Sequence, residues 1–434
     1  MKDALSQACF DVAQKLAAFY NWLWDTFHRE GSRASRGIIR RIHAMIRPLL
    51  LGSAVLALIA VPAMSQQKTV KIGFVSSFSG PVAVIGNDMR NSFELGLDHV
   101  GRKLGGLPVE VIYEDDEIKP DVGLQKTQKL VQSDHVDFLV GYIWSNVFLA
   151  SLPTMVDSKT MTVVTNAGAS QLAGNQCSPY IFSTSFQNDQ VPAAVGTYMN
   201  SKGIKSVFLM APNYTAGKDM ATGFKSTFKG QIVGEEYTRW PDQLDFSAEL
   251  SKIRAAKPDA VYVFYPGGPG VQFMTQYAQS GLKGQIPLYS GFTVDDLSLP
   301  RLKDLAVGSQ SAMMWVSDLQ NDTNKKFVSD YKAKYKTLPS FYGADTYDSV
   351  ALINSAVTAV NGDLTNKEGM RKEMEKADFK SVRGGFKFNN NHVPIQNFYL
   401  EEARKDDDGS YSLHTMSTIV KDDQDAYHTQ CPMK

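Results

Sequence analysis

Between residues 70 and 165 the chain alternates short apolar runs with longer segments whose apolar side chains recur at helical spacing. The segment 89–100, for example, places Phe93, Leu97 and Val100 on one helical face. Strands are predicted over 70–76, 109–113, 136–140 and 161–165, and helices over 89–100, 120–132 and 145–157. This order predicts a mainly parallel sheet covered by helices.

The same alternation begins again beyond residue 205. Strands are predicted over 207–210, 232–237, 260–265, 286–290 and 310–316, and helices over 216–228, 246–255 and 271–280. Three further helices, over 327–336, 344–360 and 367–376, precede short alternating segments at 386–388 and 398–400. The exported part, roughly 370 residues, is too long for one typical core. We therefore expect an α/β protein with two doubly wound, mainly parallel-sheet domains.

An apolar run of about 14 residues follows Arg47 and ends before the small residues of 62–65. This run is shorter than the roughly 20 residues that a membrane-spanning helix needs. Residues 45–65 are therefore predicted to be a signal peptide, cleaved between Ser65 and Gln66, that exports the rest of the chain. An uncleaved membrane anchor is the alternative.

Residues 1–44 precede this signal peptide. They combine a segment of helical apolar spacing, residues 9–24, with a stretch rich in arginine. Such a segment could lie on a membrane surface. The alternative, which we favour, is that Met45 is the true first residue and 1–44 is a doubtful extension.

Charge and cysteine content narrow the classes of function. The chain has 45 basic and 45 acidic side chains, so nothing predicts a nucleic-acid partner. No Cys or His grouping has the spacing of a zinc site, and we expect neither a metal nor another cofactor. The exported region contains two cysteines, Cys177 and Cys431, which predicts one disulfide in an oxidising compartment.

The turns that follow the predicted strands are the expected place for a ligand. Open parallel sheets bind ligands beyond the carboxyl ends of their strands, and two such sheets facing each other form a cleft between domains. The turns concerned are 76–86, 141–146, 165–170, 212–217, 265–270 and 290–295.

Several of these turns carry a family resemblance. The segments are KIGFVSSFSGPVA at 71–83, GYIWSNV at 141–147, TNAGAS at 165–170, YTAGK at 214–218 and YGADTYDSV at 342–350. Taken in order, they resemble the type I periplasmic solute-binding proteins of ABC importers, the leucine/isoleucine/valine-binding class. The resemblance covers essentially all of 68–434.

The resemblance implies two lobes joined by a three-segment hinge. The first lobe would comprise 68–187 plus 317–394, and the second 188–316 plus 395–434. A protein of this class captures a small solute in the periplasm as a monomer. It then delivers the solute to an inner-membrane ABC permease.

Ser145 is the central candidate for binding a ligand. It lies where a strand ends and a helix begins, so its hydroxyl and the free N–H groups of the first helical turn suit a carboxylate. The resemblance assigns the same role to Ser145, backbone contacts to Ala167 and Ala169, and closure from the second lobe to Tyr214. The full set of expected ligand-binding residues is Ser79, Ile85, Trp144, Ser145, Asn146, Ala167, Ala169, Tyr214, Tyr265 and Phe292.

One position departs from the family pattern. Amino-acid binders pair the ligand's ammonium with an acidic side chain, and here Phe292 occupies that place, with Asp295 and Asp296 beyond it. A buried ammonium without a partner costs several kcal/mol. We therefore expect a hydrophobic or aromatic carboxylate as the ligand. A branched-chain amino acid is the alternative, since a shift of one residue in the alignment would bring Asp295 closer.

Two other classes of function are less well supported. The glycine-rich segment 266–270 lacks the GK[ST] of a phosphate loop, and no G-x-S-x-G is present, so no enzyme is expected. A binding protein that presents its ligand to a membrane receptor is the remaining alternative.

Overall fold

The computed structural model describes Lys15, Ala18 and residues 68–433. The predicted signal peptide, 45–65, and nearly all of the extension 1–44 lie outside the described residues, so both stay predictions. No helix among the described residues is long and apolar enough to cross a membrane.

The first sheet has six strands in the order β2-β3-β1-β4-β5-β6. Its strands are β1 Val70–Ser76, β2 Lys103–Leu104, β3 Leu107–Asp115, β4 Phe138–Gly141, β5 Met161–Val164 and β6 Ile181–Ser183. β1 pairs in parallel with both β3 and β4, and its apolar side chains are buried, as in a sheet covered on both faces. Only β2 runs antiparallel, in a hairpin with β3.

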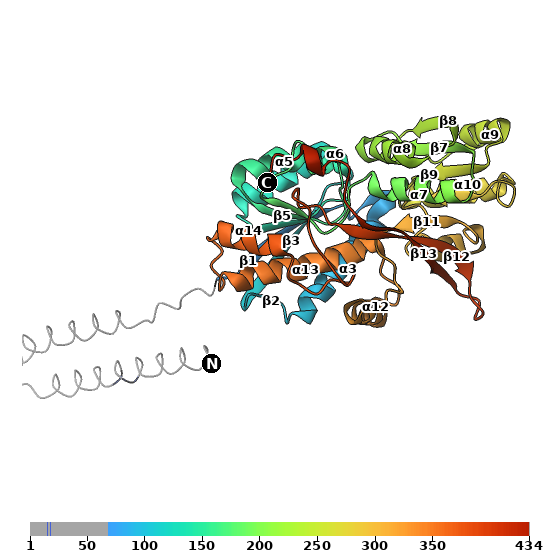
Figure 1. Ribbon diagram of the computed structural model, residues 1–434. Coiled ribbons are helices and arrows are strands. Elements are labelled where there is room, and N and C mark those ends of the chain that lie inside the picture. Colours follow the sequence, from blue (N-terminus) through green and yellow to red (C-terminus); the bar gives the residue numbers. More distant parts are fainter. Residues whose placement is uncertain (1–14, 16–17, 19–67, 434) are drawn as a thin grey trace, which may run out of the picture. The chain divides into compact units, whose positions relative to one another are not determined.

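Helices from two distant parts of the chain cover this sheet. The early ones are α3 Ala83–His99, α4 Pro120–Gln128, α5 Ser145–Ser158 and α6 Ser170–Ala173. The late ones are α12 Asp322–Tyr335, α13 Phe341–Ala359 and α14 Lys367–Lys376, and α13 packs along α3 (Figure 1). The chain therefore returns to the first sheet after it has built most of the second.

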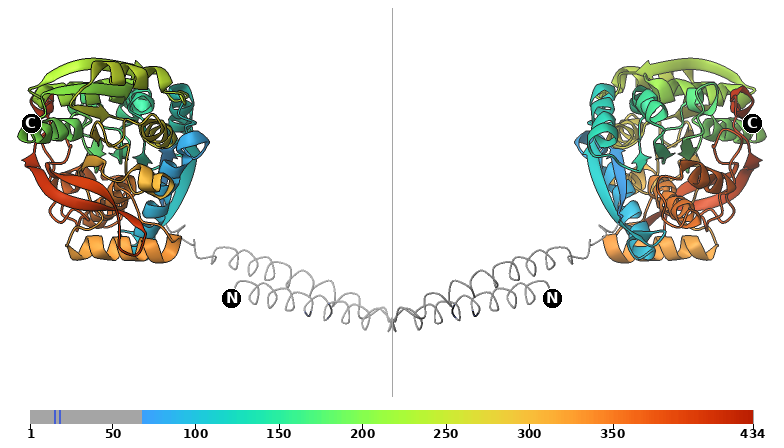
Figure 2. Two further views of the ribbon diagram at one scale, coloured as in Figure 1. Left: turned by 90° about the vertical axis from the view of Figure 1, so that its right-hand side faces the viewer. Right: turned by 90° about the vertical axis from the view of Figure 1, so that its left-hand side faces the viewer.

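The second sheet has seven strands in the order β13-β12-β11-β10-β9-β7-β8. The strands are β7 Ser206–Pro212, β8 Gln231–Thr238, β9 Ala260–Val263, β10 Leu288–Ser290, β11 Gln310–Met313, β12 Gln396–Lys405 and β13 Tyr411–Asp423. The helices are α7 Gln190–Ser201, α8 Thr215–Thr227, α9 Ser247–Ala256, α10 Gly268–Gln279 and α11 Leu299–Leu302. Strands β7 to β11 are parallel, whereas β12 and β13 form an antiparallel hairpin. Both views of Figure 2 show this hairpin, in red, on the side opposite the first strands, in blue.

The predicted fold class is confirmed, and the structure corrects it in detail. The helix predicted over 89–100 begins earlier, at Ala83, and the segment 386–388 forms only an isolated bridge between Phe388 and Pro394. The sequence pattern did not predict the strands β2, β6 and β13 or the helices α6, α7 and α11. β13 alternates poorly because it is a largely exposed edge strand.

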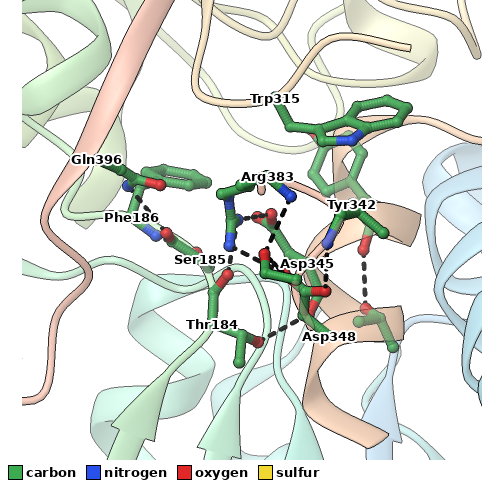
Figure 3. A network of polar contacts seen from close by, with 12 residues as sticks. Thr184, Ser185, Phe186, Trp315, Tyr342, Asp345, Asp348, Arg383 and Gln396 are labelled. Atoms are coloured by element: carbon green, nitrogen blue, oxygen red, sulfur yellow. Dashed lines mark hydrogen bonds and ion pairs between the residues drawn. The ribbon is translucent and has the colours of Figure 1, made fainter. Parts of the chain in front are cut away.

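A buried polar network joins the segments that pass between the sheets (Figure 3). Arg383 forms ion pairs with Asp345 and Asp348 of α13, and its Nη2 donates to the carbonyl of Thr184, 2.7 Å away. The side-chain amide of Gln396 donates to the carbonyl of Ser185 at 3.0 Å. Burial raises the pKa of Asp348 to about 6, even though Arg383 lowers it. The lobe boundaries stated above remain a prediction.

Buried side chains and a disulfide connect the two sheets further. The larger apolar cluster contains residues beside both sheets, and a second, smaller cluster lies within the second sheet. The disulfide predicted between Cys177 and Cys431 is present, with a Cα–Cα distance of 5.7 Å. It ties the C-terminal segment after β13 to the loop that follows α6.

Candidate ligand-binding site

A small cavity of about 20 Å³ lies where the strand ends of the two sheets face each other. Its lining comes mostly from the turns that the sequence singled out. The lining residues are Ile143, Trp144, Ser145, Asn166, Phe186, Asn188, Tyr214, Ala216, Met220, Phe264, Pro266, Phe292 and Tyr342. None of them carries a charge, so the cavity combines neutral polar groups with aromatic rings.

The polar end of the cavity lies at the start of α5. The first backbone bond there runs from the N–H of Phe148 to the carbonyl of Trp144, so the preceding N–H groups have no partner within the helix. Ser145 is the first residue of α5 and is 1% exposed, and the N-cap position before it is held by Trp144. Its hydroxyl oxygen accepts a hydrogen bond from Nδ2 of Asn188 at 3.1 Å. Since that oxygen acts as an acceptor, the hydroxyl proton can be donated to an anion.

Two asparagines complete this polar end, and sequence reasoning selected neither. Asn166 donates from Nδ2 to the carbonyl of Ile143 at 2.7 Å, while its Oδ1 is buried without a partner among the described residues. Asn188 is 2% exposed and lies at the passage from β6 to α7. Nothing in the local pattern around Asn188 indicates a ligand site, because its position depends on how the two sheets meet.

Trp144 supplies a fixed aromatic face beside Ser145. Its indole N–H donates to the hydroxyl oxygen of Ser77 at 2.7 Å, and Ser77 donates in turn to Asp116. Burial raises the pKa of Asp116 to about 6. Because the indole N–H is already used, Trp144 offers the cavity its ring.

Tyr214, just before α8, and Tyr342, on α13, both line the cavity. Tyr214 stacks on Trp240, with ring centroids 5.2 Å apart, and meets the edge of Trp144 at 6.2 Å. Neither tyrosine hydroxyl has a hydrogen-bond partner within residues 68–433, and burial raises the pKa of both well above the usual range. Both hydroxyls therefore stay protonated and can donate.

Phe292 dominates the apolar end. Its ring stacks on Phe186 at 4.7 Å and contacts Phe341 at 4.8 Å and Phe264 at 6.0 Å. Asp295 is not part of the cavity lining, and its Oδ1 accepts from the N–H groups of Leu297 and Ser298 within its own turn. One of the two oxygens of this acidic side chain is thus used within its own turn.

The structure brings together four of the ten expected residues: Trp144, Ser145, Tyr214 and Phe292 line the cavity. Tyr265 instead lies in the core of the second sheet, where its hydroxyl accepts from Thr238 at 2.9 Å. Phe264, one residue earlier, faces the cavity in its place.

The other five residues lie outside the cavity lining. Ser79 is exposed, and Ile85 is buried close to Gly267. Asn146 has a buried Oδ1 without a partner among the described residues. The N–H of Ala167 already donates to the carbonyl of Tyr142, and the carbonyl of Ala169 accepts from the N–H groups of Leu172 and Ala173. Contact of these five with a ligand stays a prediction.

The fold and the interlobe cavity define a binding protein of the periplasmic class, and comparison with known proteins agrees. A family model described as periplasmic binding protein matches residues 69–409. The chain belongs to this family. ABC solute-binding proteins of this family bind small molecules and deliver them to a membrane permease.

Individual relatives include proteins of known structure. A solute-binding protein of an ABC transporter from R. palustris, solved with benzoate, is 32% identical with a TM-score of 0.80, covering 84% of this chain and 100% of that one. Another, from Rhodopseudomonas palustris BisB5 with 3,4-dihydroxybenzoic acid, is 30% identical with a TM-score of 0.76, covering 82% and 98%. The Leu/Ile/Val-binding protein homolog 6 of Brucella melitensis is 29% identical over 81% of this chain and 92% of its own length.

Proposed function

We propose that this protein captures a small aromatic carboxylate from the periplasm, encloses it between its lobes and delivers it to an inner-membrane ABC permease. The observation that carries the proposal is the composition of the cavity. Donors at the start of α5 meet aromatic rings, and no charged side chain lines the space.

The donors and the rings suit the two ends of such a ligand. A carboxylate at the start of α5 would receive the Ser145 hydroxyl and the unpaired N–H groups, aided by the helix dipole. The flat body would lie against Trp144, Tyr214 and Phe292, whose rings favour stacked and edge contacts. The relatives solved with benzoate and 3,4-dihydroxybenzoic acid support this ligand class.

The size of the cavity implies movement. About 20 Å³ holds roughly one water molecule, whereas an aromatic ring needs a space on the order of 150 Å³. Ligand entry therefore requires the lobes to separate and to close again around the ligand. Motion of this kind is hinge closure around a ligand.

A branched-chain amino acid is the second candidate, because the curated relatives are Leu/Ile/Val-binding protein homologues. It is disfavoured because the cavity lining contains no acidic partner for an ammonium.

Calorimetric titration of the purified mature protein distinguishes the two candidates. The panel is benzoate, 4-hydroxybenzoate, 3,4-dihydroxybenzoate, leucine and isoleucine. We expect at least one aromatic acid to bind tenfold or more tightly than either amino acid. Tight binding of leucine or isoleucine together with no binding of the aromatic acids would refute the proposed ligand class.

A further inference from the structure

A carboxylate on the second sheet's α8, Asp219, reaches a helix that belongs to the first sheet. Its Oδ1 accepts from the hydroxyl of Ser170 at 3.1 Å, and its Oδ2 accepts from the backbone N–H of Ser170 at 3.2 Å. Oδ2 also accepts from Nδ2 of Asn188 at 2.9 Å. The same Nδ2 donates to the hydroxyl oxygen of Ser145 at 3.1 Å. Asp219 is thus two hydrogen bonds away from the candidate anion-binding hydroxyl.

We propose that Asp219 is a positioning residue that acts through Asn188 and makes Ser145 an obligate hydrogen-bond donor to the ligand's carboxylate. This inference rests on the proposed function, since it concerns how that site recognises an anion.

The direction of the chain of hydrogen bonds follows from chemistry. An ionised carboxylate can only accept, so Asp219 requires Asn188 to present its NH₂ group. A flipped Asn188 amide would place an oxygen against the Asp219 oxygen and leave two acceptors facing each other. With the NH₂ group held in place, both of its protons are used, one by Asp219 and one by Ser145. The Ser145 oxygen is thereby an acceptor from Asn188, and its own proton is left for the ligand.

Burial of these hydrogen bonds makes the orientation of the Asn188 amide energetically important. Asn188 and Ser145 are almost fully buried, so a misdirected donor or acceptor would not be compensated by water. Burial raises the pKa of Asp219, and the bonds from Asn188 and Ser170 oppose that rise. No ion pair involves Asp219 within the described part of the chain. Its partners are hydrogen-bond donors alone, which suits a residue that sets polarity.

The chain of hydrogen bonds also depends on closure. Ser170 begins α6, between β5 and β6 of the first sheet, whereas Asp219 lies on α8, between β7 and β8 of the second. The bonds between them therefore join the two sheets, and we expect them to form as the sheets close around the ligand. Closure and the orientation of the Ser145 hydroxyl are therefore one event.

A double-mutant cycle in the mature protein tests this. Benzoate affinity is measured by calorimetry for wild type, Asp219→Asn, Ser145→Ala and the double variant. We expect Asp219→Asn to weaken binding by about 10- to 100-fold in the wild-type background, in the range of a hydrogen bond to a charged group. In the Ser145→Ala background we expect less than about a threefold effect, because the residue through which Asp219 acts is missing.

Two controls separate positioning from simple closure. Ser170→Ala removes a hydrogen bond between the lobes but keeps the hydrogen bonds that run from Asp219 through Asn188 to Ser145. Its effect on benzoate affinity should therefore be additive with that of Ser145→Ala. Asp304→Asn makes the same chemical change at an exposed side chain and should leave affinity unchanged. If Asp219→Asn weakens binding equally in both backgrounds, Asp219 only holds the lobes together and the inference is wrong. No effect of Asp219→Asn on wild type would also overturn it.

The aromatic proposal can fail separately. If wild type does not bind benzoate, the aromatic ligand class is refuted and the cycle is repeated with leucine, whose carboxylate would meet the same hydroxyl. Coupling between Asp219 and Ser145 for leucine would then support the inference. If wild type binds neither compound, the carboxylate role of Ser145 falls, and the role of Asp219 falls with it.

Discussion

The two walls of the cavity differ in kind. The first-sheet wall offers hydrogen-bond donors at the start of α5, held by bonds from Asn188 to Ser145 and from Trp144 to Ser77. The second-sheet wall offers mainly rings, with Phe264 and Phe292 in contact at 6.0 Å, and its polar group is the hydroxyl of Tyr214. This difference divides recognition between the walls: one holds the anion and the other selects an apolar, uncharged body.

The largest change in ligand preference is expected when a charge is placed on the second-sheet wall. Phe292→Glu should reduce benzoate affinity at least about 100-fold, roughly 3 kcal/mol, because two carboxylates would share a buried space. The same variant should gain affinity for leucine, whose ammonium would acquire a partner. Calorimetry with both ligands measures the two effects.

Phe292→Leu is the matched control, since it shortens the apolar side chain without adding charge. It should lower the affinity for benzoate by less than about tenfold. If both substitutions lowered benzoate affinity equally, lost packing, and not the added charge, would explain the effect of Phe292→Glu.

The support of Trp144 in the first-sheet wall can be tested through Asp116. Asp116 accepts a hydrogen bond from Ser77, which in turn accepts from the indole N–H of Trp144. The folded pKa of Asp116, about 6, exceeds the usual value near 4, so the folded state holds this proton more strongly. Stability from this group is fully present below about pH 4 and is lost as pH rises through about 6. In wild type this loss should lower the free energy of unfolding by about 2–3 kcal/mol as pH rises. Asp116→Asn should not show this part of the decline, because asparagine does not titrate.

Chemical denaturation of wild type and Asp116→Asn at several pH values between 4 and 7 measures this effect. Asparagine keeps the accepting oxygen for Ser77 and places its NH₂ where Oδ2 is buried without a partner among the described residues. Parallel pH profiles for the two proteins would contradict the assignment.

Ser145→Ala tests the first-sheet wall, which would bind the carboxylate of the ligand. It should weaken benzoate binding by about 1–3 kcal/mol, the usual contribution of a hydrogen bond to a charged group. Ser151→Ala is the matched control, because Ser151 is a buried serine on the same helix whose hydroxyl donates to the carbonyl of Val147. Titration should show less than a twofold change for that control. Equal losses for both variants would point to damage to α5.

The sequence predicted the parts of this site that depend on local signals. Ser145 was recognisable because a strand ends and a helix begins beside it, and the order of strands and helices predicted the fold class. Asn188 and Tyr342 could not be selected in the same way, since their places depend on how distant segments meet. The β13 strand was missed because an exposed edge strand carries little apolar alternation.

Tyr265 and Phe264 show the limit at the scale of one residue. Successive side chains of a strand point to opposite faces, so neighbouring residues at its end have different environments. Here Phe264 faces the cavity and Tyr265 enters the core of the second sheet. A family resemblance without a three-dimensional register cannot choose between the two rings.

The most direct test of the central claim compares leucine with 4-methylpentanoate, which differs from leucine only by lacking the α-ammonium. Both carry the carboxylate that Ser145 and the start of α5 would hold. If the second wall offers no partner for an ammonium, 4-methylpentanoate should bind at least about tenfold more tightly in calorimetric titration. Tighter binding of leucine would contradict the account, because it would require an acidic partner within the cavity.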